Sequence, residues 1–190
     1  MNKSYIVDKI FEKINFANNE ILEGEYENCK FINCDFANAD LSNYIFSDCE
    51  FKDCNLSLVK LLNTSFRDVK FKKCKLLGCH FENCNAFLFS TMFEDCILNL
   101  SSFYKLILKK SHFKNCTLHE VDFTETDLTS SHFENCDFML ALFQNSILEK
   151  ADFRSSFNYV IDPELNRIKK AKFSLMGVVG LLSKYELEID

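Results

Sequence analysis

The 190-residue sequence contains only four glycines and one proline, and it contains no tryptophan. This low content of glycine and proline excludes a collagen-like chain and a low-complexity linker. No apolar run approaches the roughly 18 residues of a membrane span. Asp8 and Glu12 interrupt the apolar N-terminal residues, which therefore lack the core of a signal peptide. We expect a cytoplasmic protein without membrane association.

The charge also lacks the positive excess of a nucleic-acid-binding protein. The net charge is −6 and the pI is near 5.3, so direct binding to nucleic acid is not expected. Apolar residues make up 47% and charged residues 26%, which suits one globular domain with or without an appendage. The unusual numbers are 21 phenylalanines and 10 cysteines, and both need a positional explanation.

Phenylalanine and leucine recur with a period of five. Every fifth residue from Phe31 to Phe81 is one of these two types, and the period returns, shifted by two residues, from Leu88 to Phe153. A helix repeats every 3.6 residues and a strand every two, so neither produces this pattern. The position two before each of these centres is nearly always small, and all ten cysteines fall on this phase. One large and one small inward residue per unit indicate a narrow tube.

Units such as Ala39-Asp40-Leu41-Ser42-Asn43 and Ala151-Asp152-Phe153-Arg154-Ser155 resemble the pentapeptide repeat family, whose consensus is A(D/N)LXX. The resemblance covers about two thirds of the chain. It implies an all-β fold, a right-handed quadrilateral β-helix with four pentapeptides in each coil. Neighbouring coils would then be about 4.8 Å apart.

Four units per coil predict that residues 20 apart, or 22 across the two-residue shift, are vertical neighbours. The sequence shows two columns at this spacing, one of phenylalanine and one of cysteine, which supports about six coils and a rod roughly 30 Å long. The phenylalanine column contains Phe31, Phe51, Phe71, Phe93, Phe113, Phe133 and Phe153. The cysteine column contains Cys34, Cys54, Cys74, Cys96, Cys116 and Cys136.

The organisation that follows has three parts. Residues 1–25 are predicted to form an N-terminal cap with an amphipathic helix over 5–16. Residues 26–157 form the β-helix, with a two-residue phase slip near 83–88. Residues 158–190 form a C-terminal capping or dimerisation segment.

The C-terminal segment is predicted to contain two short helices. Asp162, Pro163 and Glu164 are typical of a helix start, which predicts a helix near 163–168. The triplet 171–173 resembles one returning repeat, and Ser174 is a candidate cap for a helix over about 175–184.

This tail resembles those of quinolone-resistance-type pentapeptide proteins, in which a C-terminal element builds a symmetric dimer. The resemblance implies a homodimer through the same segment. The alternative is a monomeric cap that seals the last coil. The dimerisation candidates are Leu175, Met176, Val178, Val179, Leu181 and Leu182.

The cysteines and histidines do not indicate catalysis or metal binding. The cysteine spacings are not those of zinc sites, and a buried cysteine acts as a small hydrophobic residue, so we expect ten free thiols. His112 and His132 are 20 residues apart and should stack on one face, while no acid or serine recurs beside the histidines in a triad-like pattern. No phosphate-binding glycine loop is present. The sequence therefore predicts no enzyme and no cofactor.

Outward charges largely alternate in sign from coil to coil. One predicted column reads Lys52, Lys72, Glu94, Lys114, Glu134 and Arg154, and its neighbour begins with Lys30, Glu50 and Lys70. Several family members bind type II topoisomerases by imitating DNA, which would require an acidic stripe. No predicted column is acidic throughout, so the sequence gives little support for this mimicry.

The phase slip is a second candidate surface. It brings Phe87 and Phe89 together, and Ile45, Ile107 and Ile147 are predicted to project outward on the same face. An exposed apolar strip marks partner sites, whereas a tolerated insertion would bury Phe87 locally. Both interpretations stay open at this point.

Two functions are consistent with these patterns. The first is a non-catalytic rod that acts as a protein-interaction scaffold for an unidentified partner. The second, implied by the resemblance, is binding to bacterial DNA gyrase or topoisomerase IV, with protection from quinolone or microcin-like inhibitors.

Overall fold

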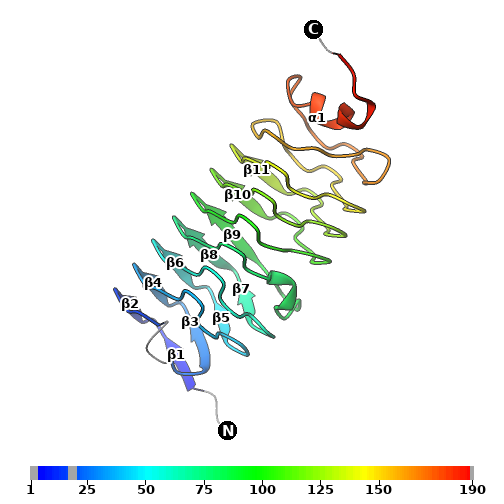
Figure 1. The fold of residues 1–190 in the computed structure, drawn as a ribbon. Coiled ribbons are helices and arrows are strands. Elements are labelled where there is room, and N and C mark those ends of the chain that lie inside the picture. Colours follow the sequence, from blue (N-terminus) through cyan, green and yellow to red (C-terminus); the bar gives the residue numbers. More distant parts are fainter. Residues whose placement is uncertain (1–3, 17–20, 189–190) are drawn as a thin grey trace.

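The computed structural model describes residues 4–16 and 21–188. The chain winds into a straight rod of stacked four-sided coils, with its two ends at opposite ends of the rod (Figure 1). Residues 26–157 make about six turns of this parallel solenoid, as the 20-residue spacing predicted. No helix in the described parts is long and apolar enough to cross a membrane.

Two of the four walls contain parallel sheets. The four-stranded wall contains β1 (Ser4–Val7), β3 (Gly24–Glu27), β5 (Ile45–Ser47) and β7 (Ser65–Arg67). The seven-stranded wall contains β2 (Ile10–Glu12), β4 (Lys30–Ile32), β6 (Glu50–Lys52), β8 (Val69–Lys72), β9 (Thr91–Glu94), β10 (His112–Lys114) and β11 (His132–Glu134). The other two walls are joined by isolated parallel bridges such as Asp35↔Asn55 and Asp40↔Lys60.

The predicted phenylalanine column forms the centre of the core. Phe31 pairs in register with Phe51, a separation of 20 residues, and Phe71 pairs with Phe93 across the slip, a separation of 22. Consecutive rings stack with centroids 4.7 to 5.3 Å apart from Phe31 to Phe153. Such pairs add about 0.5–1.5 kcal/mol each beyond the burial of their area.

The predicted cysteine column is also present, and its six thiols are buried and free. Each thiol donates a weak hydrogen bond to a carbonyl of the preceding coil, as from Cys54 Sγ to the Phe31 oxygen at 3.2 Å and from Cys74 Sγ to the Phe51 oxygen at 3.3 Å. Burial raises the pKa of Cys79 to about 12, so this thiol stays protonated. All ten cysteines are free, as predicted.

The corners of each coil explain the polar residues of the repeat. The second residue after most centres takes a left-handed conformation, such as Asn43 at φ 68° and Asn115 at φ 52°, which asparagine and aspartate tolerate well. The residue before the centre accepts the backbone N–H two positions on, as Asp40 Oδ1 does from Ser42 at 3.0 Å. The hydrogen bond accounts for the Asp or Asn of the consensus, and the left-handed corner accounts for the asparagines and aspartates that occur two residues after the centre.

The phase slip differs from its prediction in one residue. After η1 (Phe81–Asn83) the chain bulges outward, and Leu88, predicted to be a core centre, is 61% exposed with φ 58°. Phe89 instead packs against the rings of Phe66 and Phe81, each at 6.3 Å. The predicted centre was wrong because the two extra residues move the core position one residue further along the chain.

The predicted N-terminal helix over 5–16 was also wrong. These residues form β1 and β2, which pair in parallel with β3 and β4, so a coil of the solenoid begins at Ser4. Phe11 stacks on Phe31 at 4.9 Å, a contact that extends the core column. The small position of this coil is occupied by Lys9, which is exposed. Gly24 is required where β3 approaches Ser4, since a Cβ there would overlap the Ser4 oxygen.

The C-terminal segment keeps the coil longer than predicted. No helix forms over 163–168; Asp162 caps a turn by accepting the Glu164 N–H at 2.8 Å, and the chain then re-enters the wall at the bridge Ile147↔Arg167. The returning repeat at 171–173 is confirmed, because Phe173 stacks on Phe153 at 5.5 Å. Because the chain re-enters the wall, the N–H and C=O groups of Arg167 bond to the neighbouring coil and are not available to a helix.

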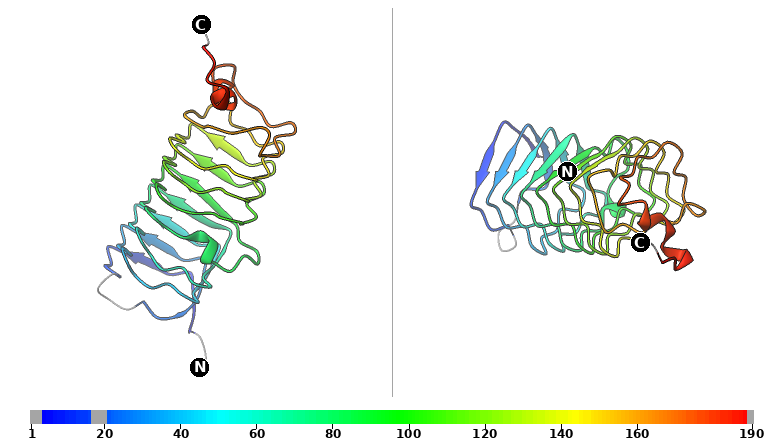
Figure 2. Two further views of the ribbon diagram at one scale, coloured as in Figure 1. Left: turned by 45° about the vertical axis from the view of Figure 1, so that its right-hand side comes forward. Right: turned by 90° about the horizontal axis from the view of Figure 1, so that it is seen from above.

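The predicted helix over 175–184 is shorter, comprising α1 (Val179–Leu182) and η2 (Ser183–Tyr185). Ser174 accepts the Gly177 N–H at 3.0 Å, but this bond closes a turn before the helix, whose N-cap residue is Val178, so the predicted role of Ser174 as helix cap was wrong. These elements lie over the C-terminal end of the rod (Figure 2). Gly177 and Gly180 face Tyr159 so closely that a Cβ on either would overlap it. The segment therefore closes the last coil.

Candidate interaction surface

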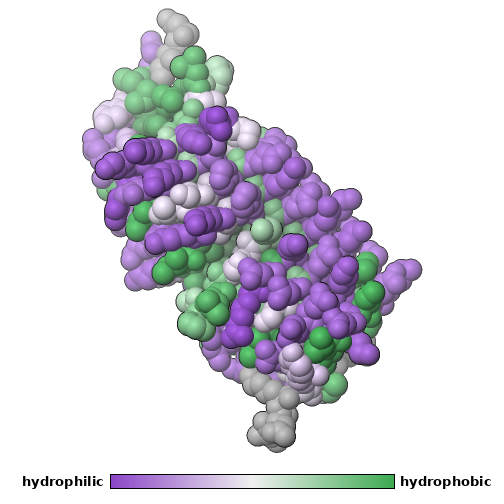
Figure 3. Space-filling view, turned by 180° about the vertical axis from the view of Figure 1, so that it is seen from behind, coloured by the Kyte–Doolittle hydropathy of each residue, from purple (hydrophilic) through white to green (hydrophobic). Residues whose placement is uncertain are grey.

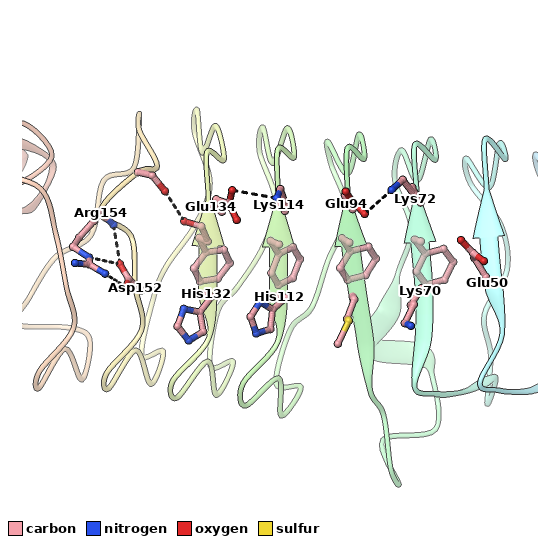
Figure 4. A pocket seen from close by; sticks show the side chains of 16 residues that line it. Glu50, Lys70, Lys72, Glu94, His112, Lys114, His132, Glu134, Asp152 and Arg154 are labelled. Atoms are coloured by element: carbon pink, nitrogen blue, oxygen red, sulfur yellow. Dashed lines mark hydrogen bonds and ion pairs between the residues drawn. The ribbon is translucent and has the colours of Figure 1, made fainter.

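A shallow groove of about 800 Å³ runs along the outer surface of the seven-stranded wall, which makes this wall the candidate site (Figure 4). It extends from Glu50 on β6 past β11 to Asp152 and Arg154. Inside the wall lie the buried rings of the phenylalanine column. Outside, the residues before and after each phenylalanine form two rows of side chains that border the groove, one residue of each row per coil.

The row that follows each phenylalanine is held together by ion pairs between coils. Lys72 Nζ lies 3.0 Å from Glu94 Oε2, and Lys114 Nζ lies 3.3 Å from Glu134 Oε1. The predicted alternation of sign is therefore confirmed over most of the row. Lys52 and Lys72 are the exception, since they are register neighbours with the same charge. Exposed pairs of this kind are worth about 0.2–1 kcal/mol each.

The C-terminal end of the groove has the tightest charge contact. Arg154 binds both carboxylate oxygens of Asp152, with Nε at 3.0 Å and Nη2 at 2.8 Å. The Arg154 guanidinium lowers the pKa of Asp152 to about 2. Lys172 Nζ lies 3.5 Å from the same carboxylate, so this carboxylate is already neutralised.

The row that precedes each phenylalanine changes from charged to aromatic along the rod. After Lys70 it continues with Met92 and then His112 and His132, whose rings stack at 4.9 Å as predicted. The two imidazoles and the thioether form a flat, weakly polar surface between the charged ends. Among residues 4–16 and 21–188, no three His, Cys, Asp or Glu side chains gather where they could hold a metal ion.

The residues predicted to form an apolar strip at the slip do not form one continuous strip. Phe87 is 68% exposed and Ile107 is 64% exposed, but Phe89 is packed against the core. Ile147 is half-buried and is separated from Ile107 by Asp127, which pairs with both in the bridge column. Ile45 is half-buried on β5, below the slip.

The dimerisation candidates lie at the C-terminal end, where apolar surface gathers on the back of the rod (Figure 3). Leu175 and Met176 are 89% and 85% exposed. Val178 and Val179 are exposed as well, whereas Leu182 is half-buried and Leu181 packs on the core. Ion pairs from Lys184 to Asp162 and Glu164 fix this segment against the preceding turn.

The groove itself was missed from the sequence. Its charged rows were visible as alternating columns, but Met92 was not singled out. The available signal was the column that Met92 shares with His112 and His132, at the 20-residue spacing. A hollow between two rows depends on side-chain directions, which the repeat does not encode.

The structure places this protein in the class of parallel β-solenoids built from a five-residue unit with four units per turn. The family model described as "Pentapeptide repeat region" matches residues 24–86 and 86–157, which is more than half of the chain. This protein belongs to the pentapeptide repeat family. A comparison with curated protein sequences gave no match.

Solved structures with the same fold include two characterised family members. A trypsin-treated variant of QnrB1, a plasmid-mediated fluoroquinolone resistance protein, is 17% identical, with 100% of each chain covered and a TM-score of 0.63. HetL, involved in heterocyst differentiation regulation in the cyanobacterium Nostoc sp. strain PCC 7120, is 14% identical, with 87% of this chain and 88% of HetL covered and a TM-score of 0.50. At these identities the likeness concerns the fold.

Proposed function

We propose that this protein is a non-catalytic interaction scaffold and that the groove on the seven-stranded wall is its partner surface. The observation that carries the proposal is the groove itself, open along several coils and bordered by side chains that are already paired. Such an arrangement offers a rigid, ordered surface to a partner.

The partner that fits best is a protein segment of mixed charge with an apolar anchor. The ion pairs leave little net field over the groove, so a polyanion would gain little there. Met92 and the stacked rings of His112 and His132 provide apolar contact area between the charged ends. Adaptable methionine and aromatic surfaces are common in protein partner sites.

A pull-down from the native cytoplasm tests this surface. The ten free thiols support a reducing compartment such as the cytoplasm. A partner retained by the wild type should be lost with Met92→Glu/His112→Glu, and should be kept with Asp122→Lys, a control on another wall. Retention by the groove variant would contradict the proposal.

A second candidate function is binding to a bacterial type II topoisomerase. It is supported by the likeness to QnrB1 over the whole of both chains. It is weakened by the charge pattern, because the paired rows of the groove contain no acidic stripe. Gyrase supercoiling assays with and without a quinolone test it. The absence of both inhibition and protection at micromolar protein would exclude this function.

We also infer that the C-terminal segment joins two copies in a homodimer. Support comes from the exposure of Leu175 and Met176, whose burial in a second copy would contribute roughly 1.5–3 kcal/mol for each side chain. Leu175→Asp/Met176→Asp should elute as a monomer on sizing chromatography. A wild-type protein that is already monomeric at high salt and high concentration would contradict this inference.

A further inference from the structure

The outer surface of the four-stranded wall separates negative from positive charge along the rod. Phe103 stacks on Phe81 and Phe113 stacks on Phe93, so residues 107–110, which lie between these rings in the chain, continue this wall above β7. The wall therefore has an N-terminal half, around β1, β3, β5 and β7, and a C-terminal half, over 107–110, 127–130, 147–150 and 167–170.

The two halves have equal and opposite formal charge. The outward positions of the N-terminal half sum to −4 and those of the C-terminal half sum to +4. The N-terminal charges are Asp8, Glu25, Glu27, Asp48, Asp68 and Arg67. The C-terminal bases are Lys109, Lys110, Lys150, Arg167, Lys169 and Lys170, and two acids lie among them.

Those two acids are already occupied. Lys109 Nζ lies 3.2 Å from Asp127 and Arg167 Nη2 lies 2.6 Å from Glu149. For Lys110, by contrast, the part of the chain that the structure describes provides no ion pair. The positive field of the C-terminal half is therefore available to an external group.

The corner column of this wall has the sharpest separation. Its left-handed corner positions carry Asp8, Asp48 and Asp68 below the slip and Lys110, Lys150 and Lys170 above it, and all six are exposed. Ser90 lies at the level between them, where its Oγ donates to Asp68 Oδ1 at 2.8 Å. The slip therefore marks the midpoint of a charge dipole along one edge of the rod.

The midpoint is apolar. The bulge that follows η1 projects from the side of the rod (Figure 1) and exposes Phe87 and Leu88. Ile107, one coil above, is exposed on the same wall. An apolar centre with charged surroundings is the anatomy of a protein interface.

We propose that this wall binds a second copy of the same chain, side by side and antiparallel, with the two-fold axis at the level of Ser90. A two-fold interface must be self-complementary, and the corner column is, because no two like charges face each other in it. In the neighbouring row Glu27 and Arg67 face Glu149 and Lys109, which are already paired within their own chain. Asp68 and Lys110 are each one coil away from Ser90, in opposite directions. Asp68 of one copy therefore faces Lys110 of the other across the axis. By the same counting Asp8 faces Lys170, and the two Phe87–Leu88 bulges meet at the centre.

The expected affinity is low. The wall is roughly 38 Å long and about 12 Å wide from strand geometry, so two copies would bury roughly 900 Å² in total, below the usual range of stable interfaces. Charge then provides much of the attraction, and a parallel pair would be rejected because like charges would meet. This contact is separate from the C-terminal one and does not depend on it.

Sedimentation velocity at high protein concentration tests the pairing, with Leu175→Asp/Met176→Asp as the background so that only lateral association is measured. We expect dimers at about 0.02 M salt that weaken by about tenfold or more at about 0.5 M salt. A monomer at low salt, or association that salt does not change, would overturn the proposal.

A charge swap identifies the contact. Lys110→Glu should weaken the low-salt dimer by about tenfold, because it faces Asp68 of the second copy. Asp68→Lys/Lys110→Glu should restore it. Lys60→Glu/Glu120→Lys, a swap on other parts of the rod, should leave it unchanged. Failure of the double variant to restore association would contradict this register.

Orientation is tested by zero-length carbodiimide crosslinking of a mixture of unlabelled and nitrogen-15-labelled protein. Mixed-isotope peptides that join Asp68 to Lys110 support the antiparallel pair. The proposal would be overturned by mixed-isotope peptides that join acids in the N-terminal half of one copy to amines in the N-terminal half of the other. It would also be overturned if all mixed-isotope peptides came from the C-terminal segment.

Discussion

The seven-stranded and four-stranded walls are built from the same five-residue unit, yet they differ inside and outside. The seven-stranded wall keeps its strands and its stacked phenylalanines through the slip, as the register of β8 with β9 shows. The four-stranded wall ends its strands at β7 and continues through isolated bridges. The two extra residues are thus absorbed by one wall only, because the other three keep their register across the slip, two with stacked rings and one through the bridge Lys75↔Ile97.

The outer surfaces differ as well. On the seven-stranded wall, opposite charges pair between coils, as Lys72 does with Glu94. On the four-stranded wall, charges of one sign occupy each half of the corner column. Outward positions are free of core constraints, so each wall can acquire its own recognition surface.

The largest expected effect is on the uninterrupted core column. Phe93→Ala removes a fully buried ring that stacks on Phe71 and Phe113 at 5.3 and 5.0 Å, and should lower the free energy of unfolding by about 3–5 kcal/mol. Phe89→Ala at the slip, where the ring is only partly buried, should cost about half as much. Equal losses in urea unfolding would remove the distinction between the walls.

The next effect concerns the small inward position. Cys116→Leu adds volume to a buried site beside the Phe113 column and should cost about 1–3 kcal/mol by overpacking. Ala86→Leu, in the exposed bulge, should change stability by less than about 0.5 kcal/mol. Thermal unfolding compares the two variants. A bulge variant as unstable as the core variant would show that the slip is packed like the rest.

Thiol reactivity should also separate the walls. Burial raises the pKa of both Cys84 and Cys79, so native labelling requires local opening. Cys84 borders the bulge, and we expect it to label about tenfold faster than Cys96, which lies just after β9 of the seven-stranded wall. Mass spectrometry of a labelling time course measures this order. All ten cysteines should label once the chain is denatured.

The smallest effect is a pH dependence at the end of the groove. Because Arg154 lowers the pKa of Asp152 to about 2, the carboxylate stabilises the fold above pH about 4 and loses this effect as the pH falls toward 2. Asp152→Asn should therefore cost about 1 kcal/mol at neutral pH, after allowance for solvent screening. The difference from wild type should shrink toward pH 2.

The matched control for this prediction is Asp48→Asn on the four-stranded wall. Asp48 lies among acids of the same sign, so its replacement should leave stability within about 0.5 kcal/mol at either pH. A loss as large as that of Asp152→Asn would mean that carboxylates stabilise both walls equally.

The core could be predicted from the sequence because its two columns repeat at a fixed spacing. Phe31 to Phe153 and Cys34 to Cys136 lie in the predicted columns. The ends could not be predicted in the same way. Residues 5–16 have apolar spacing that also suits a helix, and the pairing of β1 and β2 with the next coil and the contact of Phe11 with Phe31 decide between the two structures.

The slip and the groove were less predictable for a different reason. At the slip, Phe87, Leu88 and Phe89 are all able to fill the core, and the path of the bulge selects Phe89. In the groove, the pairing of Lys114 with Glu134 follows from the register, but its hollow depends on side-chain directions. The repeat fixes which residues are neighbours and leaves the surface shape open.

The most direct measurement of the fold's central feature is the distance along one corner of the rod. Nitroxide labels at Asp48→Cys and Lys150→Cys, in protein diluted with unlabelled chains at high salt, can be measured by double electron–electron resonance. Five coil steps separate these corner positions, so the account predicts a narrow distribution near about 24 Å. A peak beyond about 35 Å, or a broad distribution, would contradict the four-walled register.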